Sequence, residues 1–337
     1  MKGREWHLRR RPSGTPTASD VALVEVTVPE PGPGEVLVRN TAMSVEPYMR
    51  GRMSETRSYA DAYPLDAPMT GHAVGRVLAS GPDGPPVGSW VRHELGWREL
   101  AVVPGAAVDV VDVEGVDPAA FLGVLGLTGL TAYVGLRRIA ALRPGETLFV
   151  SAAAGAVGST AGQIAKAQGC IVVGSAGSPE KVARLTEDLG FDAAFDHRAG
   201  PAREQLAAAL ERAGTDGIDV YFDNVGGEQL EAAVRRMREG GRLTLCGAIA
   251  TYNATEPVPG PRNLLLMIWR RLRMEGFLVG DHEDLRPDFE RDMRAWLRAS
   301  VVRPLETRVS GGIEAAWPAF LDMLAGGSVG KSIVDLT

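Results

Sequence analysis

The chain has 337 residues, of which 45% are hydrophobic and 23% are charged, and its formal net charge is −6. A chain of this length is too long for one ordinary core, so we expect two domains. The acidic balance argues against nucleic acid as a partner, because phosphate binding requires a basic surface. No window reaches about 18 consecutive apolar residues, so we expect no membrane span. The polar, basic start of the chain lacks the apolar stretch of a signal peptide, and we expect a cytoplasmic enzyme.

The sequence pattern of the first 120 residues is typical of a compact β domain. Short Val-rich runs are separated by turn clusters such as Pro29–Gly34 and Gly81–Pro86. The runs that predict strands are 21–28, 35–39, 75–79 and 89–92. Short strands at this spacing, broken by Gly and Pro, indicate a small β-rich unit.

Beyond residue 120, apolar strand-like runs alternate with helix-length amphipathic stretches. The predicted strands are 147–153, 170–176, 193–196, 218–224 and 241–248, and the predicted helices are 156–168, 179–189, 203–213 and 228–239. Strict alternation means right-handed βαβ crossovers and a parallel sheet. The strands are apolar on both faces, as a sheet covered on both sides requires.

In the last third, the sequence predicts a helix at 262–271, a strand at 274–279 and a helix at 285–299, followed by a segment rich in predicted β-strands. The tail contains predicted strands at 306–309 and 331–336, with a helix at 313–325 between them. We interpret this tail as completing the first domain. The predicted fold class is therefore α/β, a Rossmann doubly wound parallel sheet plus a β-rich domain, with boundaries at 1–122, 123–299 and 300–337.

The segment from Phe149 to Gly158 joins a predicted strand to a predicted helix and is a dinucleotide fingerprint with Ala153 in place of its first glycine. Gly155 lets the backbone approach a pyrophosphate, and Gly158 lets the helix pack closely on the strand. The helix N-terminus then offers unpaired N–H groups and a positive dipole end. The alternative is a tight turn that binds no ligand.

The end of the next strand distinguishes NAD from NADP. An NAD site has an Asp or Glu there for the ribose hydroxyls, whereas residues 172–178 contain only small and apolar side chains. Lys181 begins the following helix, and His197 and Arg198 end the third strand. Cationic donors at this spot favour the 2′-phosphate of NADP(H). The alternative for Lys181 is a surface lysine.

The cysteine content argues against a zinc site. A catalytic zinc needs three protein ligands and a structural zinc often has four cysteines, but the chain has only Cys170 and Cys246, each in an apolar run. We predict two buried free thiols and no disulfide. His72 is the only histidine in a suggestive context, and we interpret it as a core or turn residue. We therefore expect no metal.

Several segments together resemble the zinc-independent prostaglandin reductase, leukotriene hydroxydehydrogenase and alkenal double-bond reductase branch of the medium-chain dehydrogenase/reductase superfamily. The matching segments cover nearly the whole chain: Met43–Arg50, Gly126–Tyr133, Ala152–Gly158, Gly177–Lys181, Tyr221–Gly227, Cys246–Asn253 and Met274–Phe277. Zinc enzymes of the superfamily carry a Cys and a Gly-His-Glu where this chain has Met43–Ser44 and Gly71–Ala73. The resemblance implies a GroES-like β-rich catalytic domain beside the Rossmann domain, and a homodimer. Met267, Ile268, Trp269 and Leu272 have spacings that suit a packing or dimer face.

The resemblance also assigns cofactor contacts by position. The positions that it implies are Pro47, Gly155, Ala156, Val157, Gly158, Ser178, Lys181, His197, Asn224, Cys246, Gly247, Ala248, Ile249, Tyr252, Phe277, Leu278, Val279 and Ser328. Three positions depart from the usual family pattern: His197 replaces a Tyr, Ser328 replaces an Asn, and Leu127–Thr128 replaces a Met-Pro pair. The first departure predicts pH-sensitive NADPH binding, since histidine titrates near neutrality.

The reaction that the resemblance implies is reduction of a carbon–carbon double bond conjugated to a carbonyl, in a small enal or enone, by hydride transfer from NADPH to the β-carbon. Charge develops on the carbonyl oxygen, and we expect Tyr252 to be its hydrogen-bond donor. Tyr48 is expected to line the substrate pocket. Tyr252 could instead only pack against the cofactor, and Tyr48 against Met49 or Met53.

Two other functions stay open on the sequence alone. The first is an NADP-dependent alcohol dehydrogenase or quinone reductase on the same scaffold. The second is a protein that binds NADPH without catalysis. The fold does not separate these possibilities, because one scaffold hosts many chemistries.

Overall fold

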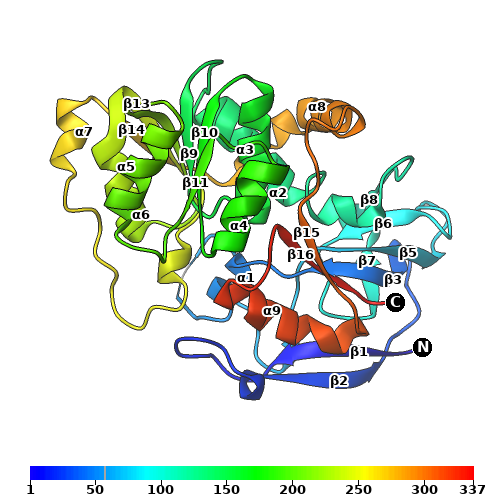
Figure 1. Ribbon diagram of the computed structural model, residues 1–337. Coiled ribbons are helices and arrows are strands. Elements are labelled where there is room, and N and C mark those ends of the chain that lie inside the picture. The colour runs from blue at the N-terminus through cyan, green and yellow to red at the C-terminus, as the bar shows by residue number, and fades with distance from the viewer. Residues whose placement is uncertain (57) are drawn as a thin grey trace. The chain divides into compact units, whose positions relative to one another are not determined.

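The computed structural model describes residues 1–56 and 58–337, and the chain divides into two compact units. Unit 1 comprises Met1–Gly123 and Glu306–Thr337, and unit 2 comprises Val124–Leu305. Unit 1 is rich in strands, and unit 2 contains a parallel sheet with helices on its faces (Figure 1). This arrangement confirms the predicted fold class.

Unit 1 contains two sheets. The smaller sheet is antiparallel, in the order β2-β1-β4, with β1 at Lys2–Leu8, β2 at Val21–Thr27 and β4 at Ala67–Pro68. The larger sheet, here the mixed sheet, has the order β15-β16-β3-β5-β6-β8, and β7 also pairs with β3. Its strands are β3 (Glu35–Ser44), β5 (Ala73–Ser80), β6 (Trp90–His93), β7 (Leu100–Pro104), β8 (Asp109–Val110), β15 (Glu306–Val309) and β16 (Lys331–Asp335).

The C-terminal tail and the N-terminal segment share the mixed sheet. β16 pairs antiparallel with β3, so that Ile333 lies opposite Ser44. Helices α1 (Tyr48–Arg52) and α9 (Ala316–Ala325) accompany the strands, with 3₁₀ turns at Ala18–Asp20, Gly105–Ala107, Pro118–Leu122 and Gly312–Ala315. Trp97, Trp317 and Phe320 are packed together in the core, with the rings of Trp97 and Phe320 edge to face at 5.8 Å. Aromatic burial of this size stabilises a unit with short strands.

Unit 2 is built on a parallel sheet with the order β11-β10-β9-β12-β13-β14. Its strands are β9 (Thr147–Val150), β10 (Ile171–Ala176), β11 (Ala193–Asp196), β12 (Ile218–Asp223), β13 (Met237–Leu245) and β14 (Arg273–Gly276). Its helices are α2 (Leu127–Val134), α3 (Ala156–Ala167), α4 (Pro179–Ala183), α5 (Ala202–Arg212), α6 (Gly227–Arg236), α7 (Leu265–Trp269) and α8 (Arg286–Arg298). Helical turns at Gly135–Ile139, Arg184–Asp188, Ile249–Thr251 and Val279–Leu285 extend or join these elements.

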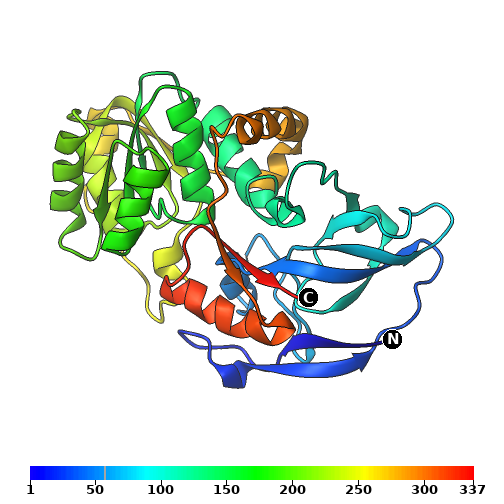
Figure 2. The same cartoon turned by 45° about the vertical axis from the view of Figure 1, so that its right-hand side comes forward.

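Both faces of the parallel sheet are covered, which explains its apolar strands. Leu206 of α5 and Leu230 of α6 belong to one buried cluster with Phe149 and Tyr221 of the sheet. Helices α2 and α3 lie on the opposite face (Figure 2). Gly135, directly after α2, leaves room there for Phe222, whose ring would lie 2.5 Å from a β-carbon at that position. Alternate side chains of β12 therefore fill the two faces in turn.

Some predicted elements differ from the structure. β1 was not predicted, because its side chains are mostly polar, but it pairs along its whole length with β2. The helix predicted at 262–271 is reduced to Leu265–Trp269, and the strand predicted at 274–279 ends at Gly276. Phe277, Leu278 and Val279 therefore follow β14, and only Val279 begins a helical turn. No helix among the described residues is long and apolar enough to cross a membrane.

Candidate functional site

The candidate site lies where the strands of the parallel sheet end. The strand order reverses its direction of growth between β9 and β12, which is the topological switch point of a Rossmann sheet. In such sheets ligands bind outside the carboxyl ends of the strands, near the switch point. Every cofactor contact predicted within unit 2 follows the carboxyl end of one of these strands. We call this side of the sheet the carboxyl edge.

The turn after β9 carries the predicted pyrophosphate site. Ala152 has a left-handed backbone with φ of 47°, and its carbonyl accepts a hydrogen bond from the N–H of Gly155 at 2.9 Å. A β-carbon on Gly158 would lie 2.5 Å from the Ala152 carbonyl oxygen, so only glycine fits there. Helix α3 begins at Ala156 without a side-chain cap. The first N–H groups of a helix have no partner within it, so those of α3 could bind an anion.

A buried carboxylate organises the switch point. Oδ1 of Asp223, the last residue of β12, accepts hydrogen bonds from Ser151 Oγ at 3.0 Å and Tyr221 Oη at 2.7 Å. It also accepts the N–H groups of Val225 at 2.9 Å and Gly226 at 2.8 Å. Asp223 is only 1% exposed, and these four donors offset the cost of burying its charge. The network ties the turn after β9 to the turn after β12.

Asn224 extends this network. Its side-chain amide donates to the carbonyl of Ser151 at 2.7 Å, and its N–H donates to Ser151 Oγ at 2.9 Å. Its own carbonyl accepts the N–H of Ile249 at 3.2 Å. Asn224 is therefore fixed between the turn after β9 and the loop after β13. The family resemblance implied that Asn224 contacts the cofactor, but the sequence did not reveal Asp223 and Ser151 as the residues that hold it.

The end of β10 carries the predicted NADP-specific residues. Ser178 caps α4 by accepting the N–H of Lys181 at 3.3 Å. A β-carbon on Gly177 would lie 3.3 Å from Nε2 of His197 and 3.5 Å from Nε of Arg198. Burial, and then the charge of Arg198, lower the pKa of His197, whereas Asp196 opposes them. The described residues at the end of β10 include no acid that could bind a ribose hydroxyl pair.

The loop after β13 lies beside the switch point. The N–H groups of Cys246 and Gly247 donate to the carbonyl of Asp223 at 2.8 and 3.1 Å. Cys246 lies one residue beyond its strand and is partly exposed, which corrects the prediction of a buried strand residue. The ladder with β12 ends here because the next N–H, that of Gly247, donates to the same carbonyl of Asp223. Burial of the Cys246 thiol, and then the charge of Asp223, nevertheless raise its pKa to about 12, so it stays a protonated thiol. Cys170 is a free, buried thiol, as predicted, and lies just before β10.

Tyr252 follows the short helical turn Ile249–Thr251. Its hydroxyl would lie 3.5 Å from a β-carbon on Gly247, so the phenol reaches back across the loop after β13. Burial raises its pKa, Cys246 raises it further, and a backbone hydrogen bond with Ala248 lowers it. The phenol is therefore protonated at neutral pH and can donate a hydrogen bond. Ala248 and Ile249 complete this loop.

Three predicted residues, Pro47, Tyr48 and Ser328, belong to unit 1. Tyr48 is the first residue of α1, and Pro47 before it has a helical backbone conformation. Burial, and then Glu46, raise the pKa of the Tyr48 phenol, which is therefore also neutral. Ser328 lies between α9 and β16.

A buried ion pair that the sequence did not reveal lies next to Tyr48. Nζ of Lys331 donates to Oε1 of Glu46, and both side chains are almost fully buried. Ser44 Oγ donates to the same oxygen at 2.9 Å. His72 lies 4.0 Å from Glu46 and 3.6 Å from Glu94. Among residues 1–56 and 58–337, no group of three or more His, Cys, Asp or Glu side chains is arranged to hold a metal ion.

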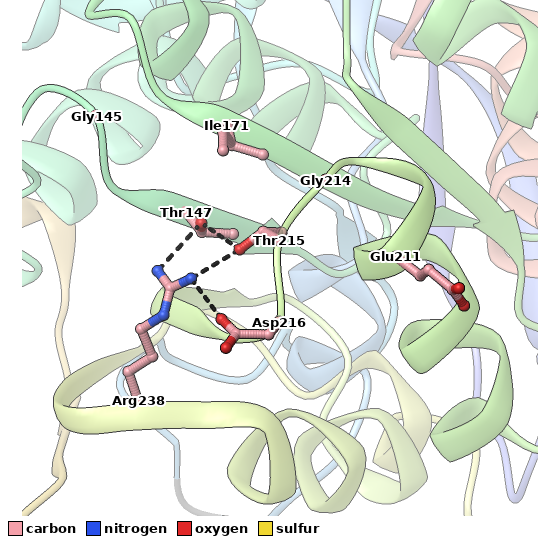
Figure 3. A pocket seen from close by; sticks show the side chains of 8 residues that line it. All are labelled: Gly145, Thr147, Ile171, Glu211, Gly214, Thr215, Asp216 and Arg238. Carbon is pink, nitrogen blue, oxygen red and sulfur yellow. Dashed lines mark hydrogen bonds and ion pairs between the residues drawn. The ribbon is translucent and has the colours of Figure 1, made fainter.

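A hollow of about 470 Å³ lies at the opposite side of the parallel sheet, where the strands begin (Figure 3). It is lined by Gly145, Thr147, Ile171, Glu211, Gly214, Thr215, Asp216 and Arg238. The guanidinium of Arg238 fills one wall and donates to Asp216 at 2.9 Å and to Thr215 at 2.8 Å. No predicted site residue lines this hollow. The guanidinium of Arg238, the cationic group in its wall, is already bound to neighbouring side chains.

Comparison with known proteins agrees with the fold. Residues 4–111 match the family described as the N-terminal domain of oxidoreductase, and residues 156–296 match the zinc-binding dehydrogenase family. The chain is similar to an NADP-dependent 2-alkenal reductase of Nicotiana tabacum, with 40% identity over 97% of this chain and 95% of that protein. It is also similar to prostaglandin reductase 1 of Rattus norvegicus, with 39% identity over 99% of both chains. The solved structure of CurA from Vibrio vulnificus in complex with NADPH has a TM-score of 0.93, 39% identity and 99% coverage of both chains.

These similarities extend over both units. The chain is an oxidoreductase of the medium-chain dehydrogenase/reductase superfamily. Within that superfamily it belongs to the zinc-independent prostaglandin reductase and alkenal reductase branch, which confirms the resemblance found in the sequence.

Proposed function

We propose that this protein is an NADPH-dependent reductase of the carbon–carbon double bond of α,β-unsaturated aldehydes or ketones. The observation that carries this proposal is the carboxyl edge of the parallel sheet, where a phosphate-binding turn follows β9, the side chains of His197 and Arg198 follow β11, and the neutral phenol of Tyr252 follows β13. The relatives that reduce alkenals and prostaglandins, and the neighbour that contains NADPH, support the same reaction class.

The residues of the carboxyl edge fit NADPH. The turn formed by Gly155, Ala156, Val157 and Gly158 would hold the pyrophosphate, because a β-carbon at Gly158 would collide with the backbone and α3 offers its N–H groups. Lys181 and His197, with Ser178, would hold the 2′-phosphate. The remaining contacts are proposed for Pro47, Asn224, Cys246, Gly247, Ala248, Ile249, Tyr252, Phe277, Leu278, Val279 and Ser328. When bound, NADPH supplies the hydride for the β-carbon of the substrate.

Tyr252 stabilises the reacting carbonyl. Negative charge grows on the carbonyl oxygen as the β-carbon is reduced, and a donor already in place lowers the energy of that charge. The Tyr252 phenol keeps its proton at neutral pH, because burial raises its pKa. Backbone hydrogen bonds within residues 248–252 hold the loop that carries it. Tyr48, also a neutral phenol, lines the substrate side in unit 1.

We also propose that two copies associate through the end of the parallel sheet. β14 is the last strand of the sheet order, and Leu265, Ile268 and Trp269 of the neighbouring α7 are 55%, 72% and 64% exposed. Met267 and Leu272 instead pack against the unit 2 core, so the apolar residues of this segment divide between a packing face and a free face. An exposed strand and an apolar helix face favour a symmetric partner. Light scattering of the purified protein tests the expected dimer.

The function is tested by NADPH oxidation with straight-chain alkenals, aryl enones and quinones, and by NADP⁺ reduction with alcohols. We expect turnover with enals or enones, and Tyr252→Phe should lower it roughly 10- to 1000-fold, the scale of one lost oxyanion donor. Tyr133→Phe is the matched control, because it removes a phenol that donates to Asp292 at 2.7 Å. NADPH affinity should be nearly equal in all three proteins.

Other results of this substrate screen would indicate one of the alternative functions. Activity with alcohols or quinones alone would indicate a dehydrogenase or quinone reductase on this scaffold. Tight NADPH binding without turnover of any of these substrates would indicate a non-catalytic binding protein. Equal turnover in Tyr252→Phe and the unmodified protein would remove Tyr252 from the reaction.

A further inference from the structure

Five titratable side chains lie in a row at one end of the mixed sheet, where β15, β16, β3, β5 and β6 are neighbours. In that order they are Glu306, Lys331, Glu46, His72 and Glu94, here called the polar row. Glu306 and Lys331 begin β15 and β16 and lie opposite each other in the ladder. Glu46 and Glu94 follow β3 and β6, and His72 precedes β5. The sheet therefore brings together groups that are far apart in the sequence.

Backbone hydrogen bonds fix His72 in the middle of the polar row. The N–H of Ser44, the last residue of β3, donates to the carbonyl of His72 at 3.0 Å. On the other side, the N–H of Gly71 donates to the carbonyl of Glu94 at 2.8 Å. The imidazole therefore starts from a backbone that is held between the end of β3 and the end of β6.

The two carboxylate oxygens of Glu46 have different surroundings. Oε1 accepts hydrogen bonds from Lys331 Nζ and from Ser44 Oγ, whereas Oε2 lies 4.0 Å from Nδ1 of His72. Nδ1 of His72 is buried and has no hydrogen-bond partner among residues 1–56 and 58–337. Burial raises the pKa of Glu46, but Lys331 and then His72 outweigh it, so the carboxylate is charged at neutral pH. An ionised acceptor therefore faces an unpartnered imidazole nitrogen.

The other nitrogen of His72 leads to the surface. Nε2 lies 3.6 Å from Oε1 of Glu94, whose side chain is 77% exposed, while the imidazole itself is only 14% exposed. The two ring nitrogens thus face a buried carboxylate and a solvated one. A neutral imidazole accepts a proton on one nitrogen and gives one from the other, which makes it a proton shuttle between such groups.

His72 is neutral at neutral pH. Burial has the largest influence and lowers its pKa, and the charges of Lys331 and Arg92 lower it further. Glu46 and Glu94 oppose this shift without cancelling it. The titratable and charged groups that face the imidazole come from the ends of β3, β6 and β16, and they are Glu46, Arg92, His93, Glu94 and Lys331.

The inner end of the polar row adjoins Tyr48. Glu46 precedes Tyr48 by two residues, and its carbonyl accepts the N–H of Met49 at 3.1 Å, so both belong to the turn that begins α1. Of the charged groups near the Tyr48 phenol, Glu46 has the largest influence on its pKa. A chain of titratable groups therefore runs from the exposed Glu94 through His72 and Glu46 to the neighbourhood of this phenol.

We infer that the polar row carries a proton from solvent to Tyr48, and that Tyr48 gives this proton to the α-carbon of the substrate. This inference rests on the proposed function, which assigns Tyr48 to the substrate side. Hydride transfer to the β-carbon supplies the electron pair and leaves an enolate. The O–H bond of Tyr48 breaks as a C–H bond forms at the α-carbon. Glu46 then passes a proton from Nδ1 of His72 to the phenolate, and Nε2 regains one from Glu94 or water. Each double bond reduced consumes one solvent proton.

His72→Gln tests this path, because an amide forms hydrogen bonds but does not shuttle a proton. At saturating NADPH and enone, turnover should fall about 100-fold, the lower end of the range for a positioned acid–base group. Proton delivery then limits the rate, so the ratio of turnover in H2O to turnover in D2O should rise, and imidazole buffer should restore part of the activity. The NADPH dissociation constant should stay within about twofold.

His7→Gln is the matched control. It removes another imidazole of unit 1 that contacts a glutamate, with Nε2 of His7 2.7 Å from Oε1 of Glu5, but it lies in β1 and outside the polar row. Its turnover and its solvent isotope effect should match those of the unmodified protein. Thermal melts of both variants check that each is folded.

Two further changes test whether the groups act in one path. Glu94→Gln alters an exposed side chain, so the fold is kept, and turnover should fall only about two- to fivefold because water can replace the carboxylate. Tyr48→Phe should lower turnover about 100-fold. The double variant of Tyr48→Phe and His72→Gln should be no slower than Tyr48→Phe alone, since both changes interrupt the same path.

The failures of the two proposals are distinguishable. Equal turnover and equal solvent isotope effects in His72→Gln and His7→Gln, or losses that multiply in the double variant, overturn the proton path while enone reduction by the unmodified protein upholds the proposed function. If His72→Gln does not fold, an unchanged turnover and isotope effect in Glu94→Gln overturn the path instead. Absence of enone reduction by the unmodified protein overturns the proposed function itself.

Discussion

Strands β9 and β12 are tied together at both ends by an aspartate of β12, yet only one end is a candidate site. At the start of the strands, Oδ2 of Asp219 accepts the N–H of Thr147 at 2.8 Å and Nη1 of Arg238 at 2.7 Å. At the carboxyl edge, Asp223 accepts four donors and holds the turns that follow both strands. The two ends have the same kind of anchor and different surroundings.

The difference lies in what remains available to a ligand. Around Asp219, the donors of Arg238 are bound to Asp219, Asp216 and Thr215, so the hollow of Figure 3 faces groups that hydrogen-bond to one another. Around Asp223, the anchor binds its own loop, and the N–H groups at the start of α3 are left for an anion. The direction of the strands therefore locates the candidate site, and a hollow by itself does not.

The largest effect is expected from Gly158→Ala. Its β-carbon would lie 2.5 Å from the Ala152 carbonyl oxygen and 2.8 Å from the Ala153 α-carbon, so the turn after β9 must move. Overpacking of this kind costs about 1–3 kcal/mol, and NADPH affinity should fall about 10- to 100-fold. Fluorescence titration with NADPH and a thermal melt measure both quantities.

Gly155→Ala is the matched control for that change. Its β-carbon would meet the same carbonyl oxygen at 3.2 Å, a contact that a small shift relieves. Its affinity for NADPH should fall less than that of Gly158→Ala. Unchanged NADPH affinity in Gly158→Ala would separate the turn from cofactor binding and would remove the main distinction between the two ends of the sheet.

The sequence predicted the carboxyl edge because its signals are local. The strand, the glycine turn and the helix of the fingerprint lie within about 20 residues, and the alternation of strands and helices defines a parallel sheet. Asp223 escaped notice as an anchor because its partner Ser151 lies 72 residues away in the sequence. The Glu46–Lys331 pair spans 285 residues and carries no local signal at all.

The predicted element ends were less accurate for a related reason. β1 contains Lys2, Arg4, Glu5 and His7, and polar side chains argue against a buried strand. It forms because β2 pairs with it and because Arg4 donates to Glu99 across the unit, a partner found only in the fold. Similarly, β13 ends before Cys246 because the N–H groups of Cys246 and Gly247 both donate to the carbonyl of Asp223. Tertiary partners decide such ends.

A smaller effect is expected from replacing the two anchoring aspartates, Asp223 and Asp219, one at a time. The pair of variants separates cofactor binding from stability. Asp223→Asn removes the charge from the oxygen that accepts four hydrogen bonds and puts an NH2 group in place of the other carboxylate oxygen, which should destabilise the protein by about 1–3 kcal/mol. It should also weaken NADPH about tenfold, because Asn224 and the turn after β9 lose their support. Asp219→Asn should lower the melting temperature while NADPH affinity stays within about twofold.

Urea unfolding and NADPH titration of both variants make this comparison. Equal losses of NADPH affinity in the two proteins would mean that the anchors act only through stability. A loss confined to Asp219→Asn would transfer the site to the start of the strands and contradict the assignment of the carboxyl edge.

The smallest effect is expected from Asp216→Asn at the hollow of Figure 3. Asp216 is 95% exposed at its side chain and shares Arg238 with Asp219, which keeps the guanidinium in place when Asp216 loses its charge. Exposed ion pairs contribute little to stability. NADPH affinity, enone turnover and the melting temperature should therefore match the unmodified protein within error. A change in turnover of more than about fivefold would exceed what an exposed pair explains and would show that the hollow takes part in the reaction.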